Sequence, residues 1–177
     1  MIDKKELPFI VSLINDESES VRTNILNGLL EFGPKLYEYL TENNCGLNDH
    51  GMRYLFKLLT EYVSKKPENN TLSKYKIGEV ITHQRYHYDG VIADIDFYCL
   101  ADENWYKNNN TQPLKMQPWY HILVDNSSTV TYAAESSLFS PEYFTEIKHP
   151  FIQYFFTGSD NNQYIRNQEP WPREDKP

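Results

Sequence analysis

A short segment of the chain places two histidines, an arginine and two tyrosines within six residues: His83, Arg85, Tyr86, His87 and Tyr88. A cation, two imidazoles and stackable rings could hold a phosphate together with a base, or an extended peptide. The same residue types also pack and hydrogen-bond turns at the rim of a sheet, and this structural role is the alternative. We expect His83, Arg85, Tyr86 and His87 to belong to a binding surface.

A second group of aromatic side chains lies in the segment WYHILV. Side chains alternate along a strand, so one of Trp119 and Tyr120 faces the core. With Tyr120 in the core, Trp119 and His121 lie on the other face, where they can pair with Tyr132 as an aromatic platform. Trp105 is a third candidate, because a tryptophan in a polar segment has to bury its ring somewhere. Packing without a binding role is again the alternative.

The residue spacing gives little support for a metal site or a catalytic site. His83 and His87 are four apart, which aligns side chains on a helix but not on a strand or turn, and nothing forces Cys99 near them. The chain has no G-x-S-x-G motif, no phosphate-binding glycine loop and no Cys-His pair with a plausible third member. We therefore expect no catalytic residue, no metal, no cofactor and no small-molecule substrate, so the protein is not an enzyme.

The composition narrows the choice of partners and compartment. The 177 residues carry a net charge of −8, the opposite sign to that of a protein binding nucleic acid without sequence preference. No apolar run approaches the roughly 18 residues of a membrane span, and the first residues lack the apolar stretch of a signal peptide. Two cysteines cannot form a disulfide framework. We expect a cytoplasmic protein without a membrane partner.

The first third of the chain has a helical apolar period. Val21, Ile25 and Leu29 recur at steps of four. Asp16 or Ser18 can cap the helix that this spacing predicts. The period indicates three or four antiparallel helices in this part of the chain.

Residues 13–33 resemble one unit of a HEAT-type repeat. The resemblance rests on the acidic turn, the pair Val21-Arg22 and the closing glycine. No second copy with the same signature is evident, and a solenoid needs several repeats to bury its faces. We therefore expect a HEAT-like helical segment over residues 1–66.

The apolar period changes to two after a linker at residues 67–74, which carries a proline and two consecutive asparagines. Several short strands with turns at close spacing favour a small antiparallel barrel. Val80, Ile95 and Val124 are expected in its core. Asp89-Gly90 is turn chemistry and predicts a tight turn.

The sequence also predicts the local structure of three further segments. Residues 101–117 form a long polar insertion of the kind that is functional or mobile. Ser140-Pro141 is expected to open a helix, and His149-Pro150 a second short one. Residues 169–177 are expected to form a disordered tail.

Four blocks in residues 75–140 resemble the YccV-like family, also called the HspQ or hemimethylated-DNA-binding domain family. They are Tyr75–Val80, His83–Ile92, Gln117–Val124 and Tyr132–Leu138. The continuation to Ile165 looks like the longer form of the domain at the C-terminus of certain F-box proteins. The resemblance implies an SH3-like β-barrel that binds without catalysis. It implies hemimethylated DNA as the partner or, alternatively, a protein recruited by an adaptor in regulated proteolysis or quality control.

Together these expectations describe an α+β protein: a HEAT-like helical segment, then an SH3-like antiparallel β-barrel with a C-terminal helical extension. The expected organisation is 1–66 helical, 67–74 linker, 75–168 barrel domain and 169–177 tail. A fragment of residues 74–177 should then fold alone as a mostly β domain.

Overall fold

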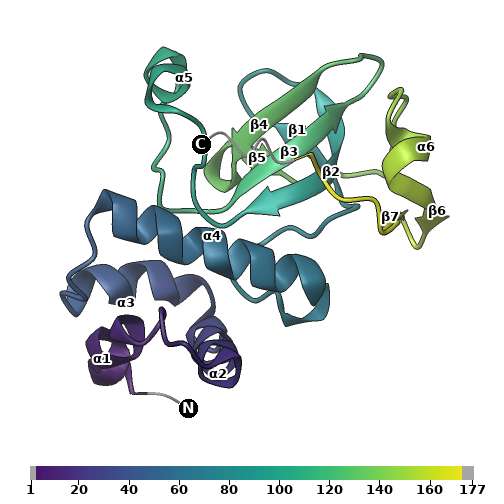
Figure 1. Cartoon of the computed structure of the whole chain (residues 1–177). Coiled ribbons are helices and arrows are strands. Elements are labelled where there is room, and N and C mark those ends of the chain that lie inside the picture. Colours follow the sequence, from purple (N-terminus) through teal and green to yellow (C-terminus); the bar gives the residue numbers. More distant parts are fainter. Residues whose placement is uncertain (1–2, 173–177) are drawn as a thin grey trace. The chain divides into compact units, whose positions relative to one another are not determined.

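The structure, a computed structural model, describes residues 3–172 and consists of two compact units. The helical unit comprises residues 1–74 and 96–118, and the sheet unit comprises residues 75–95 and 119–177. N-terminal helices and a five-stranded antiparallel sheet confirm the α+β class (Figure 1). Among the described residues, no helix is both long enough and apolar enough to cross a membrane.

The helix that the period of four predicts begins at a side-chain cap. Ser18, one of the two predicted caps, accepts the backbone N–H of Val21 at 3.4 Å, and the helix starts at the next residue. Arg22 donates to the carbonyl oxygens of Asp16 at 2.5 Å and Glu17 at 3.1 Å, which ties the acidic turn to the helix. The helices are α1 (Leu7–Ser12), α2 (Glu19–Leu30), α3 (Leu36–Glu42), α4 (Asp49–Lys65) and α5 (Glu103–Asn108), with 3-10 turns at Lys4–Glu6, Gly33–Lys35 and Pro67–Asn69.

The segment 96–118 is held by side chains of the preceding helices. The N–H of Phe97 donates to Thr60 Oγ1 at 3.1 Å, and its carbonyl accepts the Tyr37 hydroxyl at 2.6 Å. Arg53 donates to the carbonyl of Ala101 at 3.3 Å. These bonds fix the chain immediately before the expected polar insertion.

The expected insertion at 101–117 contains α5, whose N-cap Asp102 accepts the N–H groups of Asn104 and Trp105, each at 2.9 Å. A fragment of residues 74–177 would lack α3 and α4, whose side chains hold the start of this segment. Both its independent folding and the expected domain boundaries stay predictions.

The five strands of the main sheet lie in the order β4-β3-β2-β1-β5, and β6 and β7 form a separate two-stranded sheet. Neither sheet is closed into a barrel within the described residues, so the SH3-like barrel is not confirmed. The strands are β1 (Val80–His83), β2 (Asp89–Asp96), β3 (Trp119–Val124), β4 (Val130–Ala134), β5 (Leu138–Phe139), β6 (Phe156–Asp160) and β7 (Gln163–Arg166).

Each face of the main sheet has packing contacts within the sheet unit. On one face Leu123, Val91 and Ala93 pack against apolar side chains of the C-terminal segment, among them Phe155. On the other face Tyr120 contacts Tyr75, with ring centroids 5.8 Å apart. The three residues expected in the core are buried, as the period of two predicts: Val80, Ile95 and Val124.

The turn expected at Asp89-Gly90 is wrong, because β2 begins at Asp89. The chain turns earlier, where the N–H of His83 bonds the carbonyl of Tyr88 at 2.9 Å. Gly90 instead allows the side chain of Ile122 to approach the backbone of β2 closely, because a Cβ at residue 90 would lie 2.5 Å from Ile122 Cγ2. The glycine is required by a neighbouring strand rather than by a turn.

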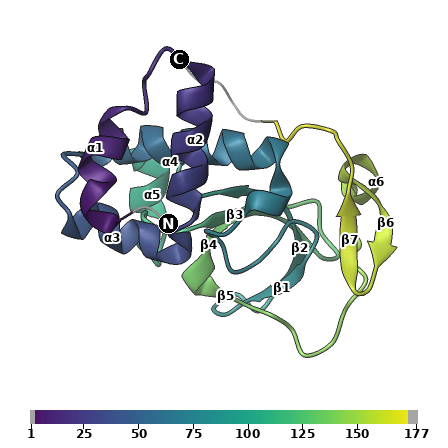
Figure 2. The same cartoon turned by 90° about the horizontal axis from the view of Figure 1, so that it is seen from below.

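The helix expected from Ser140-Pro141 is also wrong, because the chain is irregular from there to Phe151. Its N–H groups bond distant side chains instead of carbonyls one turn back: Ile147 donates to the Tyr164 hydroxyl, and Lys148 to Asp125 Oδ1, each at 2.7 Å. The expected C-terminal helical extension is reduced to the single turn α6 (Ile152–Phe155), followed by the β6–β7 hairpin (Figure 2).

The predicted tail is described only as far as Pro172, and residues 173–177 lie outside the described residues. Trp171 is half-buried and packs against the apolar cluster of the sheet unit. The prediction of a disordered tail does not anticipate this contact.

Candidate binding surfaces of the sheet unit

The turn cluster, defined here as residues 83–88, is held in place by hydrogen bonds to a buried histidine. His83 is 5% exposed, and its Nδ1 accepts the N–H groups of Arg85 at 3.1 Å and Tyr86 at 3.2 Å. Its ring lies 4.7 Å from that of Tyr86 and 5.1 Å from that of Tyr88. His83 therefore has the structural role that the sequence left open, because it holds the turn's backbone in place.

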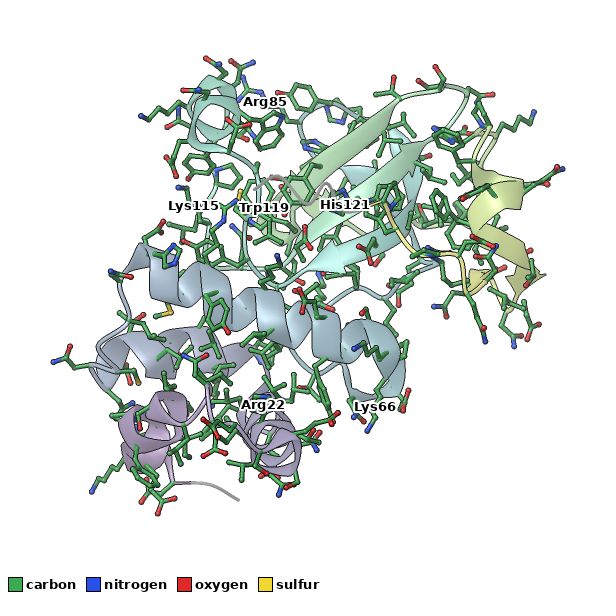
Figure 3. All side chains as sticks on the ribbon, viewed as in Figure 1. Arg22, Lys66, Arg85, Lys115, Trp119 and His121 are labelled. Atoms are coloured by element: carbon green, nitrogen blue, oxygen red, sulfur yellow. The ribbon has the colours of Figure 1, made fainter. Side chains whose placement is uncertain are left out.

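Arg85, Tyr86 and His87 are exposed on this turn, as is Gln84 before them (Arg85 is labelled in Figure 3). His87 has a φ of +52°, a left-handed conformation that costs energy for a residue with a Cβ. The Tyr88 hydroxyl bonds Thr131 Oγ1 at 2.8 Å and ties the end of the turn to β4. The structure thus presents a cation, a phenol and an imidazole side by side on a braced turn.

We expect the stability of the sheet unit to fall as the pH drops below 6.5, the ordinary histidine value. Burial, and secondly the nearby His87, lower the pKa of His83, and burial also lowers that of His149. Below pH 6.5 the unfolded chain therefore binds more protons than the folded one. The free energy of unfolding then falls as the pH drops from 6.5 to the lower pKa values of the two histidines in the folded chain. A proton on Nδ1 would also displace the N–H groups of Arg85 and Tyr86.

His83→Asn is the matched variant, because an asparagine oxygen can accept the same N–H groups without titrating. Urea midpoints measured between about pH 5 and pH 8 should fall less steeply in the variant. An unchanged pH profile would mean that His83 does not contribute.

A continuous series of rings crosses the sheet on the face covered by the C-terminal segment. We call it the aromatic row: Trp119, Tyr132, His121, Trp171 and Phe155. Successive centroids lie 5.2, 4.6, 4.9 and 5.0 Å apart. The row brings together the three residues of the predicted platform and adds two from the C-terminal segment.

The outward orientation expected of Trp119 is wrong, because its side chain is 0% exposed. His121 and Tyr132 are half-buried, and His121 is contacted by Trp171. Trp105 is 39% exposed and belongs to the helical unit. The binding roles of these four residues stay predictions.

Two residues of the row, Phe155 and Trp171, were not anticipated as part of a surface. The signal for Trp171 was present in the sequence, since a tryptophan between prolines in a polar tail also has to bury its ring. Phe155 offered no such signal, because its contacts depend on the irregular path of the preceding residues.

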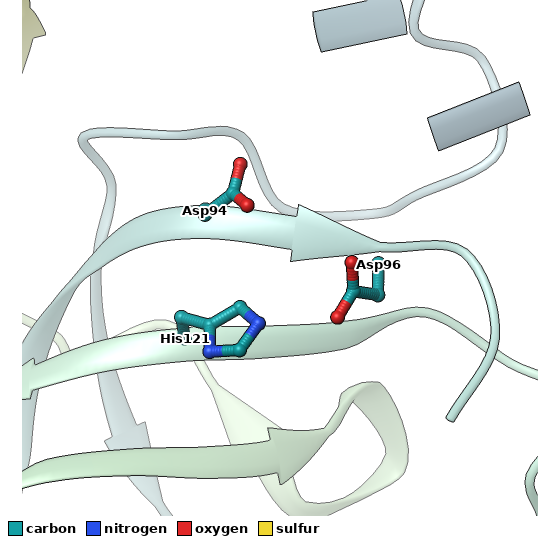
Figure 4. Close-up of side chains that lie close together, drawn as sticks. All are labelled: Asp94, Asp96 and His121. Carbon is teal, nitrogen blue, oxygen red and sulfur yellow. The ribbon is translucent and has the colours of Figure 1, made fainter. Parts of the chain in front are cut away.

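Two carboxylates of β2 and one imidazole of β3 lie close together: Asp94, Asp96 and His121 (Figure 4). Each offers one atom of a type that binds metals, and these atoms lie within 4.8 Å of one another. All three have other interactions, and the guanidinium of Arg166 already acts electrostatically on Asp94. Burial lowers the pKa of Arg166, and Asp94 opposes that shift. The expectation that the chain holds no metal stays a prediction.

Comparison with known proteins identifies the segment that carries the turn cluster and every member of the aromatic row except Trp171. The family model described as hemimethylated DNA-binding protein YccV like matches residues 73–163. F-box only protein 21 of Mus musculus is 36% identical over 98 residues, and that of Homo sapiens is 35% identical over 98 residues. The matched region is 54% of this chain but 16% and 15% of these relatives, so the chain spans about a sixth of their length.

The family match begins two residues before Tyr75 and runs through the turn cluster, the main sheet and the first residue of β7. YccV-like domains are generally binding domains without catalysis. Since more than half of the sequence falls within the match, this chain belongs to the YccV-like family.

Proposed function

We propose that the sheet unit is a non-catalytic module that binds a protein partner through the turn cluster. The observation that carries the proposal is the exposed sequence Arg85-Tyr86-His87 on a turn braced by His83. Arginine and tyrosine are the residue types that most often anchor protein interfaces, and a turn fixed in advance loses little entropy on binding. The adaptor role that the family resemblance implies, in regulated proteolysis or quality control, is compatible with such a surface.

The charge of the sheet unit favours a protein over a DNA duplex. Its described residues include four lysines and arginines against nine aspartates and glutamates. Of the four cations, Arg166 is partly buried and donates to the carbonyls of Ala93 and Phe155. The exposed cations of the described sheet unit are thus Lys76, Arg85 and Lys148. A duplex binder neutralises several phosphates, roughly 6–10 in well-studied cases.

Hemimethylated DNA is the second candidate partner, and the family's name supports it. Arg85 can donate two hydrogen bonds to a guanine edge, and an aromatic face can contact a methyl group in the major groove. The acidic surroundings leave few groups to hold such a complex in register. DNA binding therefore needs Arg85 even more than protein binding does.

We expect Arg85→Ala to weaken partner binding at least about tenfold, the effect of losing an interface anchor of about 1.4 kcal/mol. The free energy of unfolding of Arg85→Ala should differ from that of the wild type by no more than about 0.5 kcal/mol, because the side chain is exposed. The probes are peptides selected from a displayed random library on the wild-type chain, measured by fluorescence anisotropy. Lys76→Ala, which removes an exposed cation of the same unit outside the turn, is the matched control and should bind normally.

The same proteins are titrated with hemimethylated and unmethylated duplexes at two salt concentrations. We expect equally weak binding to both. The hemimethylated duplex could instead bind more tightly, with an affinity that falls steeply with salt and is lost in Arg85→Ala. That result would identify DNA, and not a protein, as the partner. If Arg85→Ala unfolds the chain, the side chain is a structural tie and the turn is not the binding surface.

A further inference from the structure

The C-terminal strap, defined here as Glu169–Pro172, inserts one ring into the aromatic row. The Trp171 ring lies 4.9 Å from that of His121, tilted by 38°, and 5.0 Å from that of Phe155, tilted by 35°. It also packs against the apolar cluster that covers this face of the sheet. The indole therefore occupies a slot between a ring of β3 and a ring of α6.

The chain leading to the strap is anchored by hydrogen bonds up to Glu169. Arg166 donates to the carbonyls of Phe155 at 3.0 Å and Glu169 at 2.6 Å, and Asn167 bonds the backbone of Phe155 and Tyr154. These bonds hold the hairpin and the start of the strap in place. They do not involve the ring of Trp171.

Beyond Glu169 the strap is held differently. Pro170 and Pro172 have no N–H to donate, and in the described part of the chain Trp171 is held by its ring contacts and apolar packing. Such a segment can leave the sheet without breaking a strand hydrogen bond. Its departure would expose the rings of His121 and Phe155 on either side of a vacated slot.

The seated segment itself shows which ligand chemistry the slot accepts. It takes one indole, and a proline on each side restricts the flanking backbone, so little conformational entropy is lost on seating. Proline-containing extended segments are recognised by aromatic grooves in the same way. A peptide with a proline-flanked tryptophan is therefore the ligand that matches the slot.

We propose that the slot between His121 and Phe155 binds a proline-flanked tryptophan of a partner peptide, and that Trp171 is its internal competitor. A tethered competitor acts at an effective concentration in the millimolar range. An external peptide with equal contacts binds weakly until the strap is released, and tightly afterwards. This second surface is separate from the turn cluster, so its test does not depend on the partner proposed for that turn.

The test uses the full chain and a fluorescent peptide with the sequence of residues 167–172. The peptide should bind Trp171→Ala at least about tenfold more tightly than wild type, because the slot is vacant in the variant. Tyr143→Ala removes a ring that is 74% exposed in the sheet unit and should behave like wild type. A peptide with alanine in place of its tryptophan should bind none of the three proteins.

A second measurement covers the case in which Trp171→Ala does not fold. In the wild-type chain, excess peptide should shift the indole N–H resonance of Trp171 toward its position in the free peptide. Trp171→Phe assigns the resonance. The proposal is overturned by equal affinities for wild type and folded Trp171→Ala, or by a Trp171 resonance that excess peptide does not move. A wild-type dimer that Trp171→Ala abolishes would assign the slot to the strap of a second copy and overturn it too.

Discussion

Replacing Gly78 by alanine is expected to destabilise the sheet unit by about 3 kcal/mol or more. Gly78 has a φ of +87°, and a Cβ there would lie 2.0 Å from the carbonyl oxygen of Tyr164. The close approach is built into the fold: the N–H of Gly78 bonds the carbonyl of Ile92, and its carbonyl accepts the N–H of Tyr164, each at 2.8 Å. Relief of the clash has to separate β7 from the segment before β1.

Gly46→Ala is the matched control for the energetic cost of the left-handed backbone conformation. Gly46 has a φ of +69°, but a Cβ there would have no neighbour within 4 Å. Its substitution should cost only the left-handed conformation, about 1–2 kcal/mol. Urea unfolding of both variants separates the two effects. Equal losses would mean that the contact between Gly78 and β7 does not contribute to stability.

Trp119→Ala is expected to cost about 3–5 kcal/mol, the range for deleting a large buried aromatic side chain. Trp119 is 0% exposed, and its ring lies 5.2 Å from that of Tyr132, tilted by 31°. The sequence-based expectation instead places Trp119 in an aromatic platform of the binding surface. Urea denaturation followed by circular dichroism measures the difference.

Trp105→Ala serves as the control, since the Trp105 ring is 39% exposed and its loss should cost less than about 1 kcal/mol. Trp119→Phe, which keeps a ring at the site, should fall between the two. A stable Trp119→Ala chain with lost partner binding would restore Trp119 to the binding surface.

Elements that depend on near neighbours in the chain were predictable. The period of four from Val21 to Leu29 and the capping hydroxyl of Ser18 specify α2 through contacts within a few residues. The alternation around β2 and β3 likewise predicted strands and buried positions such as Val80 and Val124. The family resemblance rested on residues 75–140, and the family model confirms it over 73–163.

The candidate surfaces were predictable only in part. The sequence brought Trp119, His121 and Tyr132 together correctly, because antiparallel pairing places His121 opposite Tyr132. It did not show that His121 is covered, because the ring that contacts it belongs to Trp171, far along the chain. Alternation reports which side chains share a face but not whether another segment packs on that face.

The sequence by itself therefore determined α2, strands such as β2 and β3, and which of their side chains share a face, since these follow from local periods and caps. Only the tertiary structure decided the use of Gly90, the irregular path after Ser140 and the contact that covers His121. Each depends on a neighbour distant in sequence: Ile122 beside Gly90, Tyr164 bonded to the backbone after Ser140, and the C-terminal segment over the face of β3. Such contacts outweigh local propensity because a buried N–H needs a partner and a buried face needs cover, wherever in the chain these come from.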